Sequence, residues 1–429
     1  MYRFFAHNKV TLMKHYLIFS VLSAALSSLS GVSAAAQVFL TLEELDTPAA
    51  LNAESPSLAM MPDGRVLMSW IETNGPVRAA VKTAVLDGSD WSKPVAVVES
   101  DDLFINYADF PSVAALPEGT LVTSWSRMSS DSYYAYDTVI SLSRDSGASW
   151  SAGIVPHQDR SERQHGFMSI VSNGSGGITA MWLDGQDYDI VDSQGGAEAE
   201  GNAMQLRSTT LSSDGALSEE VLLDERTCTC CQTTAVALED GTVLLAYRDR
   251  TEAEIRDISL VRQVDGVWSQ PVEVSGDEWE ISGCPVNGPA IDAHGSQVAL
   301  VWFTAADETP AVRMAFSDDR GANFGVPMSI DLGAPFGGVD VVQLSDGSAL
   351  FSWVERTAAG EVVLVCRANP SDGCGAPVAL TLVRKGRTIG FPRMVASGAD
   401  VWIAWNETSR SANGALIVRL AHATVELVK

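Results

Sequence analysis

Short apolar stretches recur along the chain with a fixed internal pattern. Each repeat has an apolar stretch, a turn that usually carries Asp-Gly, and a second apolar stretch that ends in an aromatic residue, as in "SPSLAMMPDGRVLMSW". The aromatic residues are Trp70, Trp125, Trp182, Tyr247, Trp302, Trp353 and Trp405, at spacings of 55, 57, 65, 55, 51 and 52 residues. Short strands repeated at this period predict a β-propeller with one blade per repeat.

The repeats also predict how many strands a blade has and how the ring closes. Each repeat continues with two further apolar stretches, so we expect four-stranded blades, seven in number, or six if one repeat is degenerate. The last repeat lacks a fourth stretch, whereas "QVFLTLEEL" (37–45) belongs to no repeat. We expect this segment to complete the last blade, which removes exposed strand edges. The predicted fold is all-β, with residues 37–429 as a single propeller domain.

The N-terminal residues are typical of a secretory signal peptide. Lys14 precedes an apolar run that ends in small residues before Gln37. We therefore expect residues 1–36 to be a signal peptide, with Met13 as an alternative start. The apolar run is too short and too rich in serine to span a bilayer comfortably. The predicted location is periplasmic or extracellular, where disulfides can form.

The composition is strongly acidic, with a formal net charge of −26 over 429 residues. Without residues 1–36, the chain carries 25 Lys+Arg against 54 Asp+Glu, a net charge of −29. Such a surface repels phosphate backbones and anionic headgroups, so we expect no nucleic-acid partner. No later apolar run is long enough for membrane insertion. The oligomeric state is left open.

Two turns carry a more specific motif. "SRDSGASW" (143–150) matches S-x-D-x-G-x-x-W at every position, and "SDDRGANF" (317–324) differs only in its final Phe. In such a turn the Asp caps backbone N–H groups, the Gly takes a positive φ and the aromatic residue packs between strands. The chain thereby resembles the sialidase-like, Asp-box (BNR-repeat) propellers. The resemblance implies that the face opposite the Asp boxes is the working face, built from the segments that enter each first strand.

This resemblance makes exo-sialidase activity on sialosides one candidate function. Sialidases bind the substrate carboxylate with three arginines and use a tyrosine as nucleophile and an aspartate as acid/base. The R-I-P motif of their first arginine is absent here, which counts against this activity. Tyr247 ends a repeat, so it is expected to pack in the core. The weak catalytic candidates are Arg248, Arg250, Arg256, Arg393, Tyr247 and Asp109.

Sulfur is concentrated in one short segment, "TCTCCQT" (227–233), although the chain has only six cysteines. Cys284 is expected to open the next blade, and His165 the preceding one, at the same rim of the channel. Three uses stay open: a soft-metal site, a thiol redox site and a structural disulfide. Thiolates select Cu(I) or another soft metal, whereas thiols beside arginines acquire lowered pKa values and redox activity. The candidate metal ligands are Cys228, Cys230, Cys231, Cys284 and His165, with Met168 as a further thioether donor.

The last two cysteines are expected to have a structural role. Cys366 and Cys374 flank the turn "RANPSDG", where a disulfide can link the two strands of a hairpin. The favoured function is a secreted propeller with a copper-type or redox site at the channel mouth. Its partner there would be a small ligand, a glycan or a metal ion. A binding or scaffold propeller without chemistry is the remaining alternative, so whether the protein is an enzyme stays open.

Overall fold

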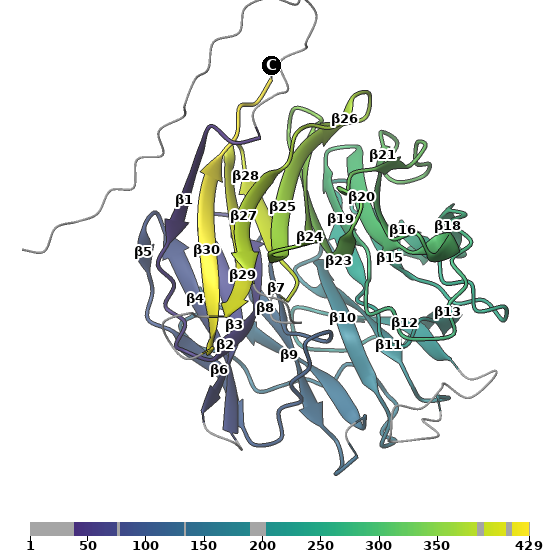
Figure 1. Cartoon of the computed structure of the whole chain (residues 1–429). Coiled ribbons are helices and arrows are strands. Elements are labelled where there is room, and N and C mark those ends of the chain that lie inside the picture. The colour runs from purple at the N-terminus through teal and green to yellow at the C-terminus, as the bar shows by residue number, and fades with distance from the viewer. Residues whose placement is uncertain are drawn as a thin grey trace, which may run out of the picture. The chain divides into compact units, whose positions relative to one another are not determined.

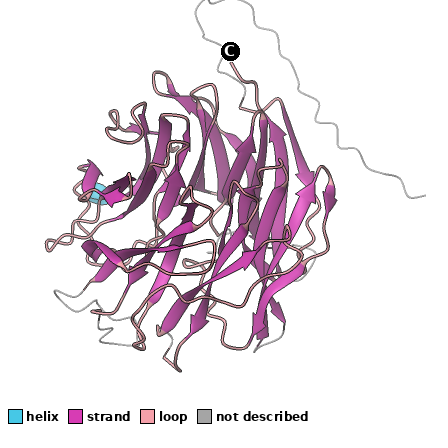
Figure 2. Ribbon diagram, turned by 180° about the vertical axis from the view of Figure 1, so that it is seen from behind, coloured by secondary structure: helices cyan, strands magenta, loops and turns pink. Residues whose placement is uncertain are grey.

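The computed structural model describes residues 38–74, 78–132, 134–188, 203–383, 390–408 and 414–428. Regular structure in these ranges is almost entirely β-strand (Figure 2), and the helical part that is described is one 3-10 turn, Ala306–Glu308. The predicted signal peptide, residues 1–36, lies outside the described residues. Among the described helices, none is long and apolar enough to span a bilayer.

The described strands form seven antiparallel sheets, which are the blades (Figure 1). Blade 1 contains β2 (Ala53–Met60), β3 (Val66–Asn74), β4 (Arg78–Asp87), β5 (Asp90–Trp91) and β6 (Val95–Ser100). Blade 2 contains β7 (Ser112–Ala115), β8 (Leu121–Met128) and β9 (Tyr136–Ser143). Its outer edge is extended by an isolated bridge between Ile140 and Ile154, which stands where the other blades have a fourth strand.

The middle blades follow in chain order around the ring. Blade 3 contains β10 (His165–Ser172), β11 (Ile178–Asp184), β12 (Met204–Leu211) and β13 (Val221–Thr227). Blade 4 contains β14 (Thr234–Ala237), β15 (Val243–Arg248), β16 (Ile258–Val264), β17 (Val267–Trp268) and β18 (Val272–Ser275). Blade 5 contains β19 (Ala290–His294), β20 (Gln297–Thr304), β21 (Ala311–Ser317) and β22 (Met328–Ser329).

The last two blades complete the ring. Blade 6 contains β23 (Pro335–Gln343), β24 (Ala349–Thr357), β25 (Gly360–Asn369), β26 (Gly373–Cys374) and β27 (Val378–Val383). Blade 7 contains β28 (Arg393–Ser397), β29 (Asp400–Thr408), β30 (Leu416–Thr424) and, from the N-terminal side of the chain, β1 (Thr41–Leu45).

Pairing between β1 and β30 closes the ring. The two strands are antiparallel, with Thr41 opposite Thr424 and Leu45 opposite Leu420. Just before β1, Val38 is buried among apolar side chains of blades 6 and 7. The predicted seven-bladed propeller and its closure by the N-terminal strand are confirmed, and the alternative of six blades is wrong.

The aromatic residue that marks each repeat is a core residue. Trp70, Trp182 and Trp353 are fully buried on the second strands of their blades. Each indole N–H donates a hydrogen bond to a carboxylate two residues further on, because residues i and i+2 share one face of a strand. The pairs are Trp70–Glu72 at 2.7 Å, Trp182–Asp184 at 2.8 Å and Trp353–Glu355 at 2.8 Å. These bonds satisfy N–H groups that would otherwise be buried without a partner.

The Asp-box turns have the predicted geometry. Asp145 accepts hydrogen bonds from the Ser143 hydroxyl at 2.8 Å and from the Ser149 amide at 2.9 Å. Gly147 has a φ of 85°, which a glycine adopts without strain. Trp150 donates from its indole to Thr83 of blade 1 at 3.0 Å, so the motif also links two blades. The second motif repeats the Ser-to-Asp bond at 2.8 Å between Ser317 and Asp319.

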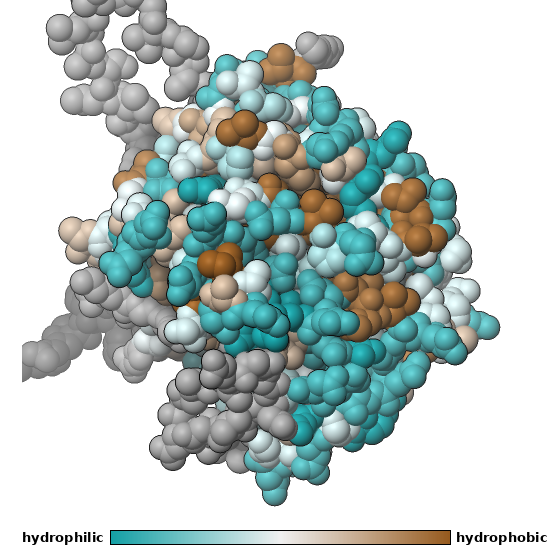
Figure 3. Space-filling view, turned by 90° about the vertical axis from the view of Figure 1, so that its right-hand side faces the viewer, coloured by the Kyte–Doolittle hydropathy of each residue, from teal (hydrophilic) through white to brown (hydrophobic). Residues whose placement is uncertain are grey.

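One face of the molecule can be judged for its surface polarity. On the face shown in Figure 3, hydrophilic residues predominate and the apolar residues form small separate patches. This agrees with a core that lies between the blades.

Closure of the ring predicts that removing the Phe39 side chain, which lies just before β1, lowers the free energy of unfolding strongly. Phe39 is 5% exposed and packs between blades 6 and 7, whereas the adjacent Leu40 is 53% exposed. Phe39→Ala should lower the free energy of unfolding by about 3 kcal/mol, because it leaves a cavity in the closing blade. Leu40→Ala, the matched control, should change it by less than about 0.5 kcal/mol. Urea denaturation measures both, and equal effects would contradict the closure described here.

Candidate functional site

The first strands of all seven blades line one central channel. Its volume is about 360 Å³, and its wall includes residues of β2, β7, β10, β14, β19, β23 and β28 or of the segments that enter them. Three carboxylates, Asp109, Asp292 and Asp340, and one guanidinium, Arg393, belong to this wall. The predicted working surface therefore surrounds a real cavity.

The three channel carboxylates hold neighbouring blades together. Each accepts a hydrogen bond from a backbone amide on the first strand of the following blade. The pairs are Asp109–Phe167 at 2.9 Å, Asp292–Gln343 at 2.7 Å and Asp340–Met394 at 2.6 Å. Burial raises the pKa of Asp109 to about 6, that of Asp292 to about 7 and that of Asp340 to about 6. Asp109, a weak catalytic candidate, thus has a structural use between blades 2 and 3.

The four cysteines of the predicted site are divided between one disulfide and two free thiols. A disulfide joins Cys230, at the entry to blade 4, with Cys284, at the entry to blade 5. Cys228 and Cys231 are free thiols, and both are buried. With this bridge formed, Cys230 and Cys284 do not offer thiolates, and the metal shell of four cysteines and His165 stays a prediction. The hairpin disulfide expected between Cys366 and Cys374 is present.

A turn between β13 and β14 explains this pairing. An extended segment would place Cys228 and Cys231 on opposite sides, but Thr229 and Cys230 form a turn. The turn brings the Cys228 and Cys231 Sγ atoms to 2.7 Å, closer than unbonded sulfur atoms normally approach. It also leaves Cys228 Sγ 3.9 Å from Cys230 Sγ. The free cysteines are therefore a C-x-x-C dithiol that lies beside a disulfide.

The two free thiols have different acidities. Burial opposes ionisation of Cys228, but the hydrogen bond with Cys231 and the charge of Arg256 outweigh it and lower the pKa of the Cys228 thiol to about 7. Burial, together with the Cys228 sulfur, raises the pKa of the Cys231 thiol well above its usual value. Arg256 Nη1 lies 3.6 Å from Cys228 Sγ. Cys228 is therefore the more acidic thiol of the pair.

The arginines predicted as carboxylate ligands have structural partners. Arg248 donates to the backbone carbonyls of Asn287, Arg256 and Phe303, at 2.8, 2.6 and 2.6 Å. Arg250 and Arg256 both bind the carboxylate of Glu254, at 2.7 and 2.8 Å. Arg393 lies in the channel, 3.6 Å from Asp340. Each of the four guanidinium groups thus has a partner within the protein, and Arg250 and Arg256 share one.

Tyr247, the weak candidate for a nucleophile, is a core residue. It is fully buried, and its hydroxyl donates to the carboxylate of Asp224. Burial and the nearby Asp224 raise its pKa well above the usual value. The expectation from the repeat pattern, that this tyrosine replaces the tryptophan of other blades, is confirmed.

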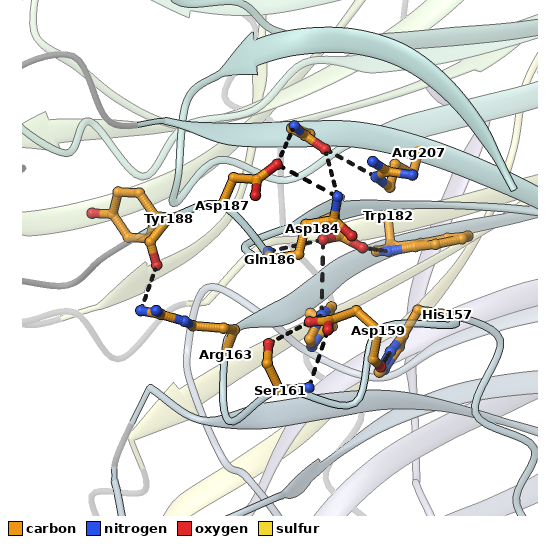
Figure 4. A network of polar contacts seen from close by, with 12 residues as sticks. His157, Asp159, Ser161, Arg163, Trp182, Asp184, Gln186, Asp187, Tyr188 and Arg207 are labelled. Atoms are coloured by element: carbon orange, nitrogen blue, oxygen red, sulfur yellow. Dashed lines mark hydrogen bonds and ion pairs between the residues drawn. The ribbon is translucent and has the colours of Figure 1, made fainter.

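His165 lies in a separate polar network, part of which Figure 4 shows. Its Nε2 is 3.0 Å from Asp159 and its Nδ1 is 3.9 Å from Asp137. His157 stacks on it, with ring centroids 3.9 Å apart and planes 7° from parallel. Asp137, His157 and His165 place ligand-type atoms within 4.8 Å of one another. However, imidazole lone pairs lie in the ring plane, so two parallel stacked rings do not direct them at one ion.

The Cys230–Cys284 disulfide, called the outer bridge below, is partly exposed to solvent at the channel mouth. Cys284 is exposed and Cys230 is partly buried. Cys284 lines a pocket of about 120 Å³ together with Tyr107, Phe336 and Phe391. Tyr107 and Phe391 also line the next pocket, which includes the predicted rim residue Glu54. The cysteine site thus lies on the predicted working face.

Comparison with known proteins adds evidence on the fold. No family model and no curated protein matches the chain. A solved protein of unknown function from Dyadobacter fermentans is 13% identical, with a TM-score of 0.51, over 90% of this chain and 99% of that one. An α-L-arabinanase from Penicillium chrysogenum is 13% identical, with a TM-score of 0.48, over 91% and 98%. An intramolecular trans-sialidase from Ruminococcus gnavus is 10% identical, with a TM-score of 0.46, over 88% and 96%.

Seven antiparallel blades and correctly placed Asp boxes decide the architecture. The chain is a seven-bladed β-propeller whose Asp-box turns resemble those of sialidase-like propellers. At these identities the likeness to solved structures concerns the fold alone. Within this propeller, what distinguishes the channel mouth is its sulfur: one dithiol and one disulfide at the entries to blades 4 and 5.

Sequence reasoning missed three features of this propeller. The first is the C-x-x-C spacing of Cys228 and Cys231, which is visible in the sequence but is interrupted by Cys230. The second is the contact between Arg256 and Cys228, because no local pattern indicates which of several nearby arginines reaches the thiol. His157 also gave no signal, since a lone histidine in a loop has no periodic partner.

The channel carboxylates predict a pH dependence of stability. The folded-state pKa of Asp292 is raised to about 7 by burial. In the unfolded chain the pKa of an aspartate is about 3.9. The stability that the protonated Asp292 carboxyl contributes is therefore fully present below about pH 3.9 and is lost as the pH rises towards 7. Asp292→Asn keeps an acceptor for the Gln343 amide but does not titrate. Relative to wild type, this variant should therefore gain stability between about pH 4 and pH 7.

Urea denaturation at stepped pH measures this difference. Asp101→Asn, which changes an exposed carboxylate, is the control and should follow the wild-type profile. If Asp292→Asn also runs parallel to wild type over this range, the Asp292 carboxyl does not carry the effect.

Proposed function

We propose that this protein is a secreted propeller that carries out thiol–disulfide exchange at its channel mouth. The observation that supports this most is the buried Cys228/Cys231 pair, with sulfur atoms 2.7 Å apart and a guanidinium 3.6 Å from Cys228. The two bridges and the lack of a spanning helix among the described residues are compatible with an oxidising location.

The chemistry is a two-electron exchange with a partner disulfide or dithiol. In the oxidising direction for this protein, the two thiols lose two electrons and two protons and form the Cys228–Cys231 bond. The disulfide of the partner accepts them and becomes two thiols. Arg256 supports the step because it stabilises the thiolate of Cys228, which is the reactive form.

Copper binding is the second candidate, and one observation favours it. The sulfur atoms of Cys228, Cys230 and Cys231 all lie within 4.8 Å of one another. If the Cys230–Cys284 bridge were reduced, three thiolates would face a common point, and thiolates prefer Cu(I) among the available ions. In this second candidate, His165 has no place, because its ring nitrogens face Asp159 and Asp137.

Glycoside hydrolysis has less support. The arginines that a sialoside carboxylate would need are committed to backbone carbonyls or to Glu254 and Asp340. If the Cys228/Cys231 pair proved inert, the remaining candidate function would be a binding propeller without catalytic activity.

The exchange function predicts the thiol content and its response to oxidation. Protein unfolded without reductant should show two thiols per chain, from Cys228 and Cys231. Diamide on the native protein should remove both together, and peptide mapping should find the Cys228–Cys231 bond. Cys228→Ser should leave one thiol that diamide does not convert to a bond within the chain. Thiols that survive diamide in wild type would refute the proposal.

The copper candidate predicts a dependence on reduction. Fully reduced protein should bind about one Cu(I) per chain in competition with a chelator, because three thiolates are then available. Protein with the Cys230–Cys284 bridge intact should bind it at least about tenfold more weakly. Cys231→Ser should weaken binding to the reduced protein, whereas the double change Cys366→Ser and Cys374→Ser should not. Equal affinity with and without the bridge would exclude the three-thiolate site.

A further inference from the structure

The sulfur atoms of the channel mouth are close enough to exchange bonds with one another. Cys228 Sγ lies 2.7 Å from Cys231 Sγ and 3.9 Å from Cys230 Sγ. Cys230 is itself bonded to Cys284 of the next blade. One buried nucleophile thus has both a thiol partner and a disulfide within contact distance.

We propose that the four cysteines form an internal relay, in which the buried pair Cys228/Cys231 exchanges electrons with the outer bridge Cys230–Cys284. In this relay Cys284 is the sulfur that meets external thiols and disulfides. The inference rests on the proposed exchange function and assigns its point of contact with the partner.

The relay proceeds in two balanced steps. First, the Cys228 thiolate attacks Cys230 Sγ, so that a Cys228–Cys230 bond forms, the Cys230–Cys284 bond breaks, and the electron pair leaves on Cys284, which takes a proton from water. Second, Cys231 loses its proton and attacks Cys228, and Cys230 leaves as a thiol. The net result is a Cys228–Cys231 bond and two outer thiols. Two electrons and two protons move outward, and no additional oxidant is consumed.

Exposure of the sulfur atoms follows the order that a relay needs. Cys228 is 0% exposed and Cys231 is 1% exposed. Cys230 is partly buried, and Cys284 is exposed and lines the pocket of about 120 Å³ at the mouth. A thiol or disulfide in solution can therefore approach Cys284, whereas the inner pair is reached through the bridge.

The charge distribution sets the direction of the first attack. Arg256 is fully buried and lies 3.6 Å from Cys228 Sγ. Its positive charge stabilises a thiolate on Cys228 in a site that water does not reach. Cys228 is also the free thiol that contacts Cys230. The acidic thiol and the thiol beside the bridge are thus the same residue.

Maleimide labelling of the native wild-type protein tests the relay. In the resting state, Cys284 is bonded and the free thiols are buried, so simple accessibility predicts almost no label. The relay instead exposes Cys284 and Cys230 as thiols while Cys228 and Cys231 become bonded. Peptide mapping should find label on Cys284 and Cys230 and a Cys228–Cys231 bond. Label confined to Cys228 and Cys231, or no label at any of the four, would overturn the relay.

Two matched variants separate the steps. Cys231→Ser removes the second attacker, so the relay stops with a Cys228–Cys230 bond and a free Cys284. Cys228→Ser removes the first attacker and leaves the outer bridge intact. Labelling of Cys284 should be at least about tenfold faster in Cys231→Ser than in Cys228→Ser, while the Cys366–Cys374 bridge stays unlabelled in both. Equal rates would overturn the relay.

The outcome is distinguishable from failure of the proposed function. If diamide oxidises Cys228 and Cys231 in wild type but maleimide never reaches Cys284, the exchange function stands and the relay fails. If diamide leaves both inner thiols unreacted, the exchange function itself fails.

Discussion

Closure of the ring by β1 is the constraint on which the site depends. Pairing of β1 with β30 joins the two ends of the described chain and leaves seven sheets packed against one another in a circle. In such a ring, segments that enter neighbouring first strands meet at the channel mouth although they are far apart in sequence. Cys230 and Cys284 are 54 residues apart and are bonded there. The sulfur site is therefore a product of the whole ring and of no single blade.

Buried polar contacts connect blades 4 and 5 at the channel mouth. Arg248 donates to the carbonyl of Arg256 in its own blade and to those of Asn287 and Phe303 in the next. A guanidinium can satisfy several acceptors in one plane, so this one side chain fixes two chain segments at once. The carbonyl of Arg248 also accepts the amide of Cys228. The same residue thus contacts both Cys228 and the blade that Cys284 precedes.

The sequence predicted the ring because its signals are local and repeated. The period of the tryptophans, the Asp boxes at 143–150 and 317–324, and the unpartnered segment before blade 1 each gave a prediction that the structure confirms. The cysteine geometry could not be predicted in the same way. It depends on one turn at Thr229 and Cys230, which occurs once and has no repeat to reveal it. For the same reason, sequence spacing assigned His165 to the sulfur atoms, whereas contacts between blades 2 and 3 place it with Asp137 and Asp159.

The arrangement of the bridges itself argues for chemistry at the mouth. A disulfide that only stabilises a hairpin needs no thiol beside it, and Cys366–Cys374 has that simple form, with its partners eight residues apart. The bridge Cys230–Cys284 instead has a buried thiol 3.9 Å from one of its sulfur atoms. A thiol in that position makes a bridge exchangeable, which a purely structural bridge does not require. The proposed electron exchange gives a use to two buried free thiols next to such a bridge, which cross-linking alone does not.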